Sequence, residues 1–376
     1  MKIVCVSASE VPSSKANSMQ VMKACQALVQ LGHDVRLLVP KFEIRNSQFD
    51  LQRFYGLDTI FPVEWLPSRP GWKRYDFCWT AIRRARTLGA QAVYVWPLQA
   101  AVFALLRRMP VLLELHGEPE GSLGPWWFRL FLRSPGRKRL LPITQALVDL
   151  LKRTYPRLGV PYCVSPNGVD LERYAGLPSS TAARQELGMS DVPTVVCTGH
   201  LYAGRGVELF VELARRFPHL NFLWVGGQPE DVEGWRKRLL SEGLSNLTLT
   251  GFVENSQLPR YQAAADVLLM PYERVIAGSG GGNSAAYCSP MKMFEYMACG
   301  RAIISSDLPV IREVLNDHNA VLCPPEDIAG WVQALRLLLD NPAVRETLAR
   351  QAFEDVQGYT WIERQRKTME GLGGSS

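Results

Sequence analysis

The segment whose residues are best suited to bind a ligand or take part in a reaction is 289–306, which reads SPMKMFEYMACGRAIISS. Ser289 suits a helix cap, Pro290 suits the first helical position, and Gly300 suits the residue after the last turn. We therefore expect a helix over about 290–299, followed by a short buried strand.

Two charged residues of this predicted helix, Lys292 and Glu295, are three positions apart and therefore share one face near its N-terminus. Free N–H groups and the helix macrodipole attract an anion at this end. A cation and an acid there suit a nucleotide, with Lys292 on a phosphate and Glu295 on a ribose diol. The alternative is an ordinary amphipathic helix whose Lys and Glu side chains are solvated.

Two loops of the second half also suit a phosphate. Arg205 precedes a glycine and a predicted helix over 207–217, which favours a phosphate contact over a solvated loop arginine. The glycine-rich loop 277–288 lies directly before the predicted helix over 290–299. It is either a flexible surface loop or, as its position favours, backbone that approaches a ligand.

Strand and helix patterns alternate along both halves of the chain. The first half opens with a strand over 1–7, a helix over 17–31 and a strand over 34–39, and it is expected to end with a strand over 162–164. The second half repeats the alternation from a strand over 194–198. This pattern predicts an α/β protein with two Rossmann-like, doubly wound domains and a cleft between them.

The domain limits follow from the loss of this pattern over 176–191, which is the best candidate for a linker. We expect an N-terminal domain over 1–175 and a C-terminal domain over 176–358. The segment 359–376 has a helical pattern with no strand after it, and we expect it to cross back to the first domain.

Composition narrows the class of protein. With 376 residues, of which 47% are hydrophobic and 21% charged, the chain suits two globular domains. The run 92–106 is broken by Pro97 and Gln99 and is too short for a membrane span, and the N-terminus becomes polar too soon for a signal peptide. Eight cysteines occur singly and in no metal-binding spacing, so we expect a cytoplasmic protein with reduced thiols. No DxD or HxxxH spacing indicates a metal site either, and we expect no metal and no cofactor.

Positive charge is concentrated in the first half, because residues 66–139 hold thirteen Lys and Arg against four Asp and Glu. Within it, 125–139 reads PWWFRLFLRSPGRKR and contains no acid. It is either an interfacial helix that meets an anionic membrane or a partly buried helix whose arginines are solvated. Nucleic acid is disfavoured as a partner because no recognition module is visible. The membrane candidates are Trp126, Trp127, Arg129, Arg133, Arg137, Lys138 and Arg139, with Trp72, Lys73, Arg83, Arg84 and Arg86 as companions.

Taken together, these motifs resemble the family 4 (group 1) glycosyltransferases, which have the GT-B fold of two Rossmann-like domains. The matching pieces occur in the family's order over nearly the whole chain. They are the opening MKIV with LGHDVRLL, then SPNGVDLERY, GHLYAGRGVELF, TGFVENSQLPRYQAAADVLLMPY, SPMKMFEYMACGRAIISSDLPVIREVL and a terminal helix that contains TW.

The resemblance implies that the N-terminal domain over 1–175 binds the acceptor and the C-terminal domain over 176–358 binds the donor. It also implies roles for individual residues. Arg205 and Lys292 would bind the donor diphosphate, Glu295 the nucleotide ribose, and His116 would contact the transferred sugar or flank the reaction centre. Asn17 and Ser18 lie in the first loop, where Asn17 either contacts donor or acceptor or caps a helix. The further donor-binding candidates are Gly251, Phe252 and Val253 for the base, with Gly281, Gly282, Asn283, Ser289 and Met291 around the glycine-rich loop.

Two positions depart from the family pattern. Tyr287 stands eight residues before Glu295, where the family often has an acid that contacts the sugar hydroxyls. Either backbone amides of 281–289 bind the sugar instead, or turnover of the donor is impaired. His200 stands where many relatives have an arginine, which leaves its contribution to phosphate binding open.

The resemblance implies a retaining, metal-independent glycosyltransferase that uses a UDP- or GDP-sugar and a saccharide or lipid-linked acceptor. It would act in cell-envelope polysaccharide or glycolipid synthesis, in the cytoplasm or at the inner face of the cytoplasmic membrane. One alternative is a soluble enzyme for a small sugar or sugar phosphate. The other is a catalytically silent GT-B protein that serves as a membrane or complex partner, which the tyrosine at position 287 would suit.

Overall fold

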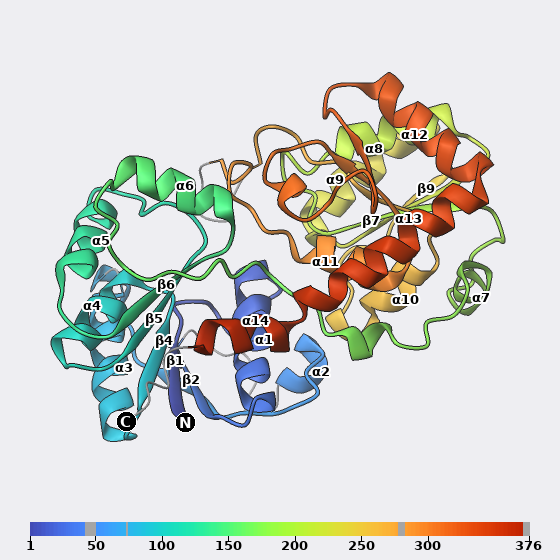
Figure 1. Cartoon of the computed structure of the whole chain (residues 1–376). Coiled ribbons are helices and arrows are strands. Elements are labelled where there is room, and N and C mark those ends of the chain that lie inside the picture. Colours follow the sequence, from blue (N-terminus) through green and yellow to red (C-terminus); the bar gives the residue numbers. More distant parts are fainter. Residues whose placement is uncertain (42–49, 73, 277–282, 371–376) are drawn as a thin grey trace. The chain divides into compact units, whose positions relative to one another are not determined.

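The computed structural model describes residues 1–41, 50–72, 74–276 and 283–370 (Figure 1). The chain forms two compact units. The first contains Met1–Asn167 and the last helix, α14 (Trp361–Met369), and the second contains Gly168–Thr360. Near the start of the second unit, the N–H of Val169 donates to the Tyr359 carbonyl at 3.0 Å.

A parallel sheet of six strands forms the centre of the first unit, in the order β3-β2-β1-β4-β5-β6. Strand β1 pairs with a neighbour on each side, so that Ile3 lies opposite both Val35 and Ala92. The carboxyl ends of parallel strands share one edge of the sheet, which is where ligands bind in such folds. The strands are β1 (Lys2–Val6), β2 (Asp34–Pro40), β3 (Val63–Leu66), β4 (Ala92–Val95), β5 (Val111–Leu115) and β6 (Lys138–Pro142).

Helices cover both faces of this sheet (Figure 1). Helices α1 and α14 pack together on one face, and α3, α4 and α5 lie side by side on the other. This arrangement follows from the strand order, because the chain moves from β1 through β2 to β3 in one direction and from β3 through β4 and β5 to β6 in the other. Right-handed crossovers in opposite directions place their helices on opposite faces. The helices are α1 (Ala16–Gln30), α2 (Leu51–Tyr55), η1 (Pro70–Trp72), α3 (Tyr75–Thr87), α4 (Leu98–Leu106), α5 (Gly124–Arg133), α6 (Gln145–Thr154) and α14.

The second unit is built on another parallel sheet of six strands, in the order β12-β11-β10-β7-β8-β9. Its core contains Trp224, Phe210 and Trp331, all fully buried, and the ring of Phe210 meets that of Trp224 edge to face at 5.3 Å. The strands are β7 (Thr194–Thr198), β8 (Asn221–Val225), β9 (Leu247–Leu249), β10 (Val267–Met270), β11 (Ala302–Ser306) and β12 (Val321–Cys323).

Helices precede, connect and follow the strands of the second unit, and those between consecutive strands form the crossovers that a parallel sheet requires. They are η2 (Leu171–Tyr174), α7 (Ser180–Glu186), α8 (Val207–Arg216), α9 (Pro229–Ser241), η3 (Asn255–Gln257), α10 (Leu258–Ala263), α11 (Met291–Cys299), η4 (Ile311–Glu313), α12 (Ile328–Asp340), α13 (Pro342–Asp355) and η5 (Val356–Tyr359). Within the described residues, no helix is both long and apolar enough to cross a membrane.

The prediction of two Rossmann-like, doubly wound α/β domains is confirmed. The strand predicted over 162–164 is wrong, because Tyr162 makes only one isolated bridge with Leu140. The N–H of Cys163 donates to the Leu140 carbonyl at 2.9 Å, but Pro142 has no N–H with which to continue the ladder. The predicted linker over 176–191 contains a helix, α7, which the Ser179 hydroxyl caps.

Candidate functional site

Helix α11 positions both charged residues that the sequence singles out. It begins at Met291, one residue later than expected, so Pro290 takes the N-cap position that was predicted for Ser289. Gly300 ends it in the left-handed conformation, with φ of 65°. Lys292 and Glu295 are each only 9% exposed, so the interpretation as a solvated amphipathic helix does not describe their side chains.

The ammonium group of Lys292 lies among rings and a thiol. Its Nζ is 5.0 Å from the ring centre of Tyr272, 5.9 Å from that of Trp224 and 3.8 Å from the sulfur of Cys197. In the part of the chain that the structure describes, no carboxylate forms an ion pair with it. A buried cation without an acid is costly unless an anion joins it.

Arg205 approaches the same tyrosine. Its guanidinium donates to the Tyr272 hydroxyl at 3.0 Å, and its Cζ lies 5.2 Å from the ring centre. Its Nε is buried, and no described residue accepts a hydrogen bond from it. Tyr272 therefore binds two cations at once, and it was missed as a functional residue in the sequence analysis.

The neighbouring thiols do not neutralise these cations. Burial raises the pKa of the Cys197 thiol, although Lys292 opposes that shift. Burial also raises the pKa of the Cys288 thiol to about 11, with Arg205 as the opposing charge. Both thiols are therefore protonated at neutral pH and supply no negative charge beside the two cations.

The loop that carries Arg205 can approach this place because of its glycines. Gly206 has φ of +77°, and a Cβ at this position would lie 1.7 Å from the Pro271 carbonyl oxygen. Gly204 has φ of +83°, and its Cβ would lie 2.1 Å from the Val275 carbonyl oxygen. No side chain fits at either position, so the loop packs directly on the segment that carries Tyr272.

Glu295 is fixed by a short hydrogen-bond chain. Gln262 donates from Nε2 to a carboxylate oxygen of Glu295 at 3.1 Å, and the Tyr174 hydroxyl donates to Gln262 Oε1 at 2.9 Å. Burial and the nearby Glu295 charge raise the pKa of Tyr174 well above its usual value, so the phenol keeps its proton and remains a donor. The carboxylate is thus held in one orientation beside Lys292 on the same helix.

Backbone lines the neighbouring edge of the sheet. Gly226 bridges to Gly251, and a Cβ on Gly199 would lie 3.3 Å from the nitrogen of Lys292. Of the predicted base-binding residues that follow β9, Phe252 is exposed while Gly251 and Val253 are half-buried. These loops come from the carboxyl ends of β7, β8 and β9, which lie next to one another in the sheet.

The remaining donor candidates have mixed positions. Asn283 braces its own loop, because its Oδ1 accepts from the N–H groups of Ile276 and Ala285. Ser289 is buried and Met291 is half-buried at the start of α11. Gly281 and Gly282 lie outside the described residues. The ring of His200 stacks on Tyr202, with centroids 4.8 Å apart.

In the first unit, His116 follows the last residue of β5 and binds a buried acid. Its Nε2 lies 2.7 Å from Oε1 of Glu114, whose side chain is completely buried. Arg364 of α14 forms an ion pair with the same oxygen at 2.9 Å. The Tyr94 hydroxyl and the Gln20 amide also donate to this carboxylate. The sequence analysis missed Glu114 and Arg364, which are 250 residues apart.

Opposing effects act on the pKa of Glu114. Burial raises this pKa, but Arg364, His116 and Tyr94 together lower it by more, so that it falls from 4.5 to about 2. Glu114 is therefore ionised at neutral pH in the folded chain. The pKa of Arg364 is raised because Glu114 and Tyr94 outweigh the effect of its burial.

The first loop places its two candidates on α1. Asn17 accepts a hydrogen bond from the Ser18 N–H at 2.9 Å, and the Ser18 hydroxyl bonds to that of Tyr55. The N-cap of α1 is Lys15, so Asn17 lies in the first turn and does not cap the helix. Asn17 is exposed, whereas Ser18 is fully buried.

The basic aromatic segment 125–139 divides into two groups. Trp126 is 53% exposed, whereas Trp127 is 8% exposed and donates to the Tyr75 hydroxyl at 3.1 Å. Lys138 donates to carbonyls at the end of α5, and Arg139 donates to carbonyls at the end of α14. The three other basic residues, Arg129, Arg133 and Arg137, are exposed.

Family models match both halves of the chain. The model described as "Glycosyltransferase Family 4" matches residues 18–173, and "Glycosyl transferases group 1" matches residues 192–341. A GDP-mannose-dependent alpha-(1-6)-phosphatidylinositol monomannoside mannosyltransferase of Mycolicibacterium smegmatis is 33% identical over 303 residues, which cover 75% of this chain and 75% of that protein. The chain belongs to the family 4 glycosyltransferases.

Other relatives of this glycosyltransferase match over less of their length. An alpha-galactosylglucosyldiacylglycerol synthase of Streptococcus pneumoniae is 26% identical over 54% of this chain, and the match spans 52% of that protein. A phosphatidyl-myo-inositol mannosyltransferase of M. smegmatis is 29% identical over 70% of this chain and 66% of its own length.

Solved structures support the fold of the glycosyltransferase. HepE of Anabaena in complex with UDP-glucose superposes with a TM-score of 0.75 at 17% identity, over 100% of both chains. Sucrose-phosphate synthase of Thermosynechococcus elongatus superposes with a TM-score of 0.74 at 17% identity, over 97% of this chain and 96% of the other.

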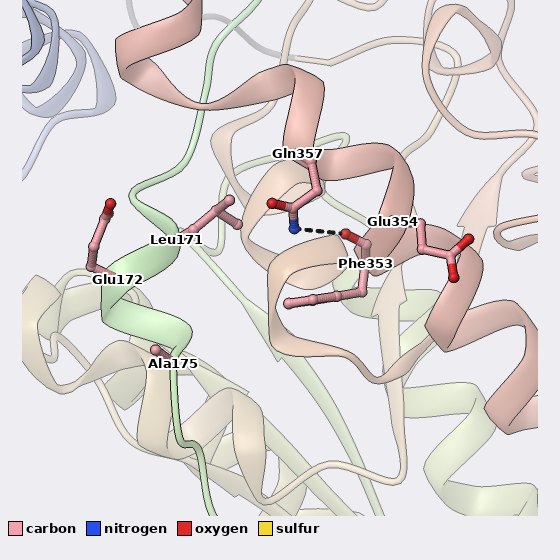
Figure 2. A pocket seen from close by; sticks show the side chains of 6 residues that line it. All are labelled: Leu171, Glu172, Ala175, Phe353, Glu354 and Gln357. Carbon is pink, nitrogen blue, oxygen red and sulfur yellow. Dashed lines mark hydrogen bonds between the residues drawn. The ribbon is translucent and has the colours of Figure 1, made fainter.

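A separate hollow of about 430 Å³ lies in the second unit between η2 and the end of α13 (Figure 2). In Figure 2, Leu171 and Phe353 point toward one another, whereas Glu172 and Glu354 point away from each other, and the Gln357 amide donates to the Phe353 carbonyl at 3.0 Å. None of the residues predicted to bind donor or acceptor lines this hollow. Within the described residues, no group of three or more His, Cys, Asp or Glu side chains is arranged to hold a metal ion.

The Arg205 loop gives the first prediction. Gly206→Ala should destabilise the second unit by more than Gly300→Ala, because both positions have positive φ but only Gly206 lacks room for a Cβ. We expect Gly300→Ala to cost about 1 kcal/mol and Gly206→Ala clearly more, measured by urea denaturation. Equal losses for the two variants would contradict the close packing of this loop.

The buried pair in the first unit gives the second prediction. Arg364→Met should cost about 3–5 kcal/mol at pH 7, because it leaves Glu114 charged, buried and without its cation. The double variant Glu114→Leu with Arg364→Met should be more stable than Arg364→Met alone. Urea denaturation of the three chains would measure this, and a double variant that is no more stable than the single one would refute the coupling.

The same pair predicts how stability depends on pH. The pKa of Glu114 is lowered from 4.5 to about 2 on folding, so its contribution is fully present above pH 4.5 and is lost as the pH falls towards 2. The wild-type chain should therefore lose more stability between pH 5 and pH 2 than the double variant, by up to about 3 kcal/mol. Parallel losses in acid denaturation curves would count against an ionised Glu114.

Proposed function

We propose that the chain is a retaining, metal-independent glycosyltransferase that moves a sugar from a nucleoside diphosphate sugar to a saccharide or lipid-linked acceptor. The observation that carries the proposal is the pair of cations on Tyr272. Lys292 and Arg205 share one ring, and no described carboxylate pairs with either. A diphosphate is the anion that fits two such cations at the start of a helix.

The chemistry of the transfer needs this charge. When the bond between the anomeric carbon and the diphosphate breaks, negative charge grows on the leaving phosphate oxygens. Fixed cations in a site with little water stabilise that charge without reorganising. Lys292 and Arg205 would supply this stabilisation, and Glu295, held by Gln262, would accept hydrogen bonds from the ribose hydroxyls. The segment 251–253 would meet the base.

Retention and metal independence complete the proposal for the donor. The leaving phosphate, held on the same face of the sugar as the incoming hydroxyl, would accept the proton of that hydroxyl. No carboxylate pair of the glycosidase type is then needed. The neutral side chain of Tyr287 fits this scheme only if other groups bind the sugar hydroxyls, and backbone amides near Ser289 are the candidates.

The relatives suggest a lipid-linked acceptor. The names of several of them refer to phosphatidylinositol or to diacylglycerol glycolipids. We assign the acceptor to the first unit, with His116 near the reacting groups and Asn17 at the first loop. The protein would then work in cell-envelope glycolipid or polysaccharide synthesis, in the cytoplasm at the inner face of the membrane.

An exposed surface of the first unit suits this location. Trp126 lies on α5, and Trp79 and Leu106 lie exposed on α3 and α4, which pack in the same layer. Arg107 stacks on Trp79, with its Cζ 3.9 Å from the ring centre, and burial together with the positive charges of Arg86 and Arg83 lowers the pKa of Arg107. Exposed aromatic and basic groups together favour an anionic lipid surface. Lys138 and Arg139 are not part of this surface, because they donate to carbonyls at helix ends.

A soluble acceptor is the second candidate. A D-inositol 3-phosphate glycosyltransferase of Kineococcus radiotolerans is 26% identical over 55% of this chain. A phosphorylated sugar would use the basic residues of the first unit instead of a membrane. Transfer to a soluble sugar phosphate but not to lipid vesicles would select this alternative.

Nucleotide affinity tests the donor site. Titration calorimetry with UDP and GDP should show binding of at least one of them to the wild-type chain. Lys292→Gln and Arg205→Gln should each weaken it by about 10- to 100-fold, because each removes a charge-assisted hydrogen bond of about 1.5–3 kcal/mol. Lys237→Gln is the matched control, since Lys237 is an exposed lysine of the same unit that pairs with Glu233. Unchanged affinity in both site variants would reject the donor site.

Vesicle binding tests the membrane surface. The chain should sediment with vesicles of phosphatidylglycerol and phosphatidylcholine at low salt and be released at high salt. Trp126→Ala, alone or with Arg129→Gln and Arg133→Gln, should reduce binding. Phe353→Ala is the control, because Phe353 is an exposed aromatic residue of the second unit. Equal binding by all variants would place membrane contact elsewhere or nowhere.

A further inference from the structure

The unusual feature of the first unit is a fully buried acid that faces a partly exposed histidine. The side chain of Glu114 has no solvent exposure, whereas that of His116 is 35% exposed. The two residues sit on β5 and just after it, at the carboxyl edge of the sheet. We propose that Glu114 is the positioning residue for His116, and that Arg364 of the last helix keeps it in the charged form that this requires.

The geometry defines which nitrogen of His116 is available. An ionised carboxylate only accepts hydrogen bonds, so the Nε2 that lies 2.7 Å from Glu114 must carry a proton. Nδ1 is then the nitrogen left for a substrate group. The pair thus fixes both the orientation and the tautomer of the imidazole.

Arg364 is itself held in place by the chain around it. Its guanidinium donates to the carbonyls of Pro166 at 2.7 Å and Ser165 at 3.1 Å, and to the Tyr94 hydroxyl at 3.1 Å. Besides these hydrogen bonds, the guanidinium forms the ion pair with Glu114. The last helix therefore supplies the charge that keeps Glu114 ionised, even though α14 follows the whole second unit in the sequence.

The consequence for the reaction rests on the proposed function. A histidine whose ring is fixed can hold a hydroxyl of the sugar or of the acceptor through Nδ1 without first losing rotational freedom. Glu114 does not touch the substrate in this scheme and acts only through His116. Orienting partners of metal-bound histidines show the size of such an effect, since their removal costs about 10- to 100-fold in affinity or activity.

Nuclear magnetic resonance of the imidazole nitrogens tests the positioning directly. The chain has five histidines, and comparison with His116→Asn assigns the signals of His116. In the wild-type chain, labelled with ¹⁵N-histidine, we expect a proton on Nε2 that exchanges slowly with water. In the double variant Glu114→Leu with Arg364→Met, whose two changes remove both buried charges, that protected proton should disappear.

A matched control separates this effect from a general loss of charge. Glu118 lies two residues after His116 in the sequence, as Glu114 lies two residues before it, and it accepts a hydrogen bond from Thr154 at 3.1 Å. Glu118→Gln therefore removes one negative charge near His116 in the sequence without changing Glu114. It should keep the protected proton. An Nε2 without a proton in the wild-type chain, or a protected proton that persists in the double variant, would overturn the proposal.

Kinetics then test the link to transfer. The assay is release of UDP from UDP-glucose or GDP from GDP-mannose in the presence of phosphatidylinositol vesicles, with whichever donor the wild type uses. The double variant should lower kcat by about 10- to 100-fold while the KM for the donor stays within about twofold, because the donor residues lie in the second unit. A wild-type kcat in the double variant or in His116→Asn would overturn the role in transfer. A wild-type chain that uses neither donor would count against the proposed function, while the resonance experiment still decides the positioning.

Discussion

The structure of the second unit depends on one electrostatic constraint, which is that two cations are held at a single tyrosine while no carboxylate of the described residues forms an ion pair with either. Lys292 and Arg205 repel each other, and the thiols beside them stay protonated. Such an arrangement is stable only because the surrounding fold determines it. The glycines at 204 and 206 press one loop onto the segment of Tyr272, and helix α11 brings Lys292 to it. An anionic ligand would relieve the repulsion, and this connects the packing to the proposed donor site.

In the first unit the buried charge is negative, and several donors bind it. Glu114 is buried, but Arg364, Tyr94, Gln20 and His116 all donate to it. The same unit uses Lys138 and Arg139 to bind the carbonyl ends of α5 and α14. The basic character of 125–139 therefore has two origins, since part of it stabilises helix ends and part is exposed. The burial of Trp127 next to the exposed Trp126 follows the same division, as expected for neighbours on a helix.

The sequence predicted those features that depend on local pattern. The strand over 194–198 has the expected limits, and the strand expected over 34–39 ends one residue later, because each is a short apolar run between turns. Helix α11 was expected to within one residue from its proline and glycine. The partners of the site residues could not be predicted. Tyr272, Gln262 and Arg364 reach their places through tertiary packing, and no spacing in the sequence links Arg364 to Glu114. Pro142 explains why the strand predicted over 162–164 is absent. It has no N–H to donate to this segment, so only the isolated bridge between Leu140 and Tyr162 forms.

A crystal structure of the chain with UDP or GDP tests the central claim most directly. The account predicts phosphate oxygens within about 3 Å of both the Lys292 nitrogen and the Arg205 guanidinium. It also predicts that the ribose hydroxyls bind Glu295. A diphosphate bound elsewhere, with Lys292 still against Cys197 and Tyr272 and no anion beside it, would contradict the account.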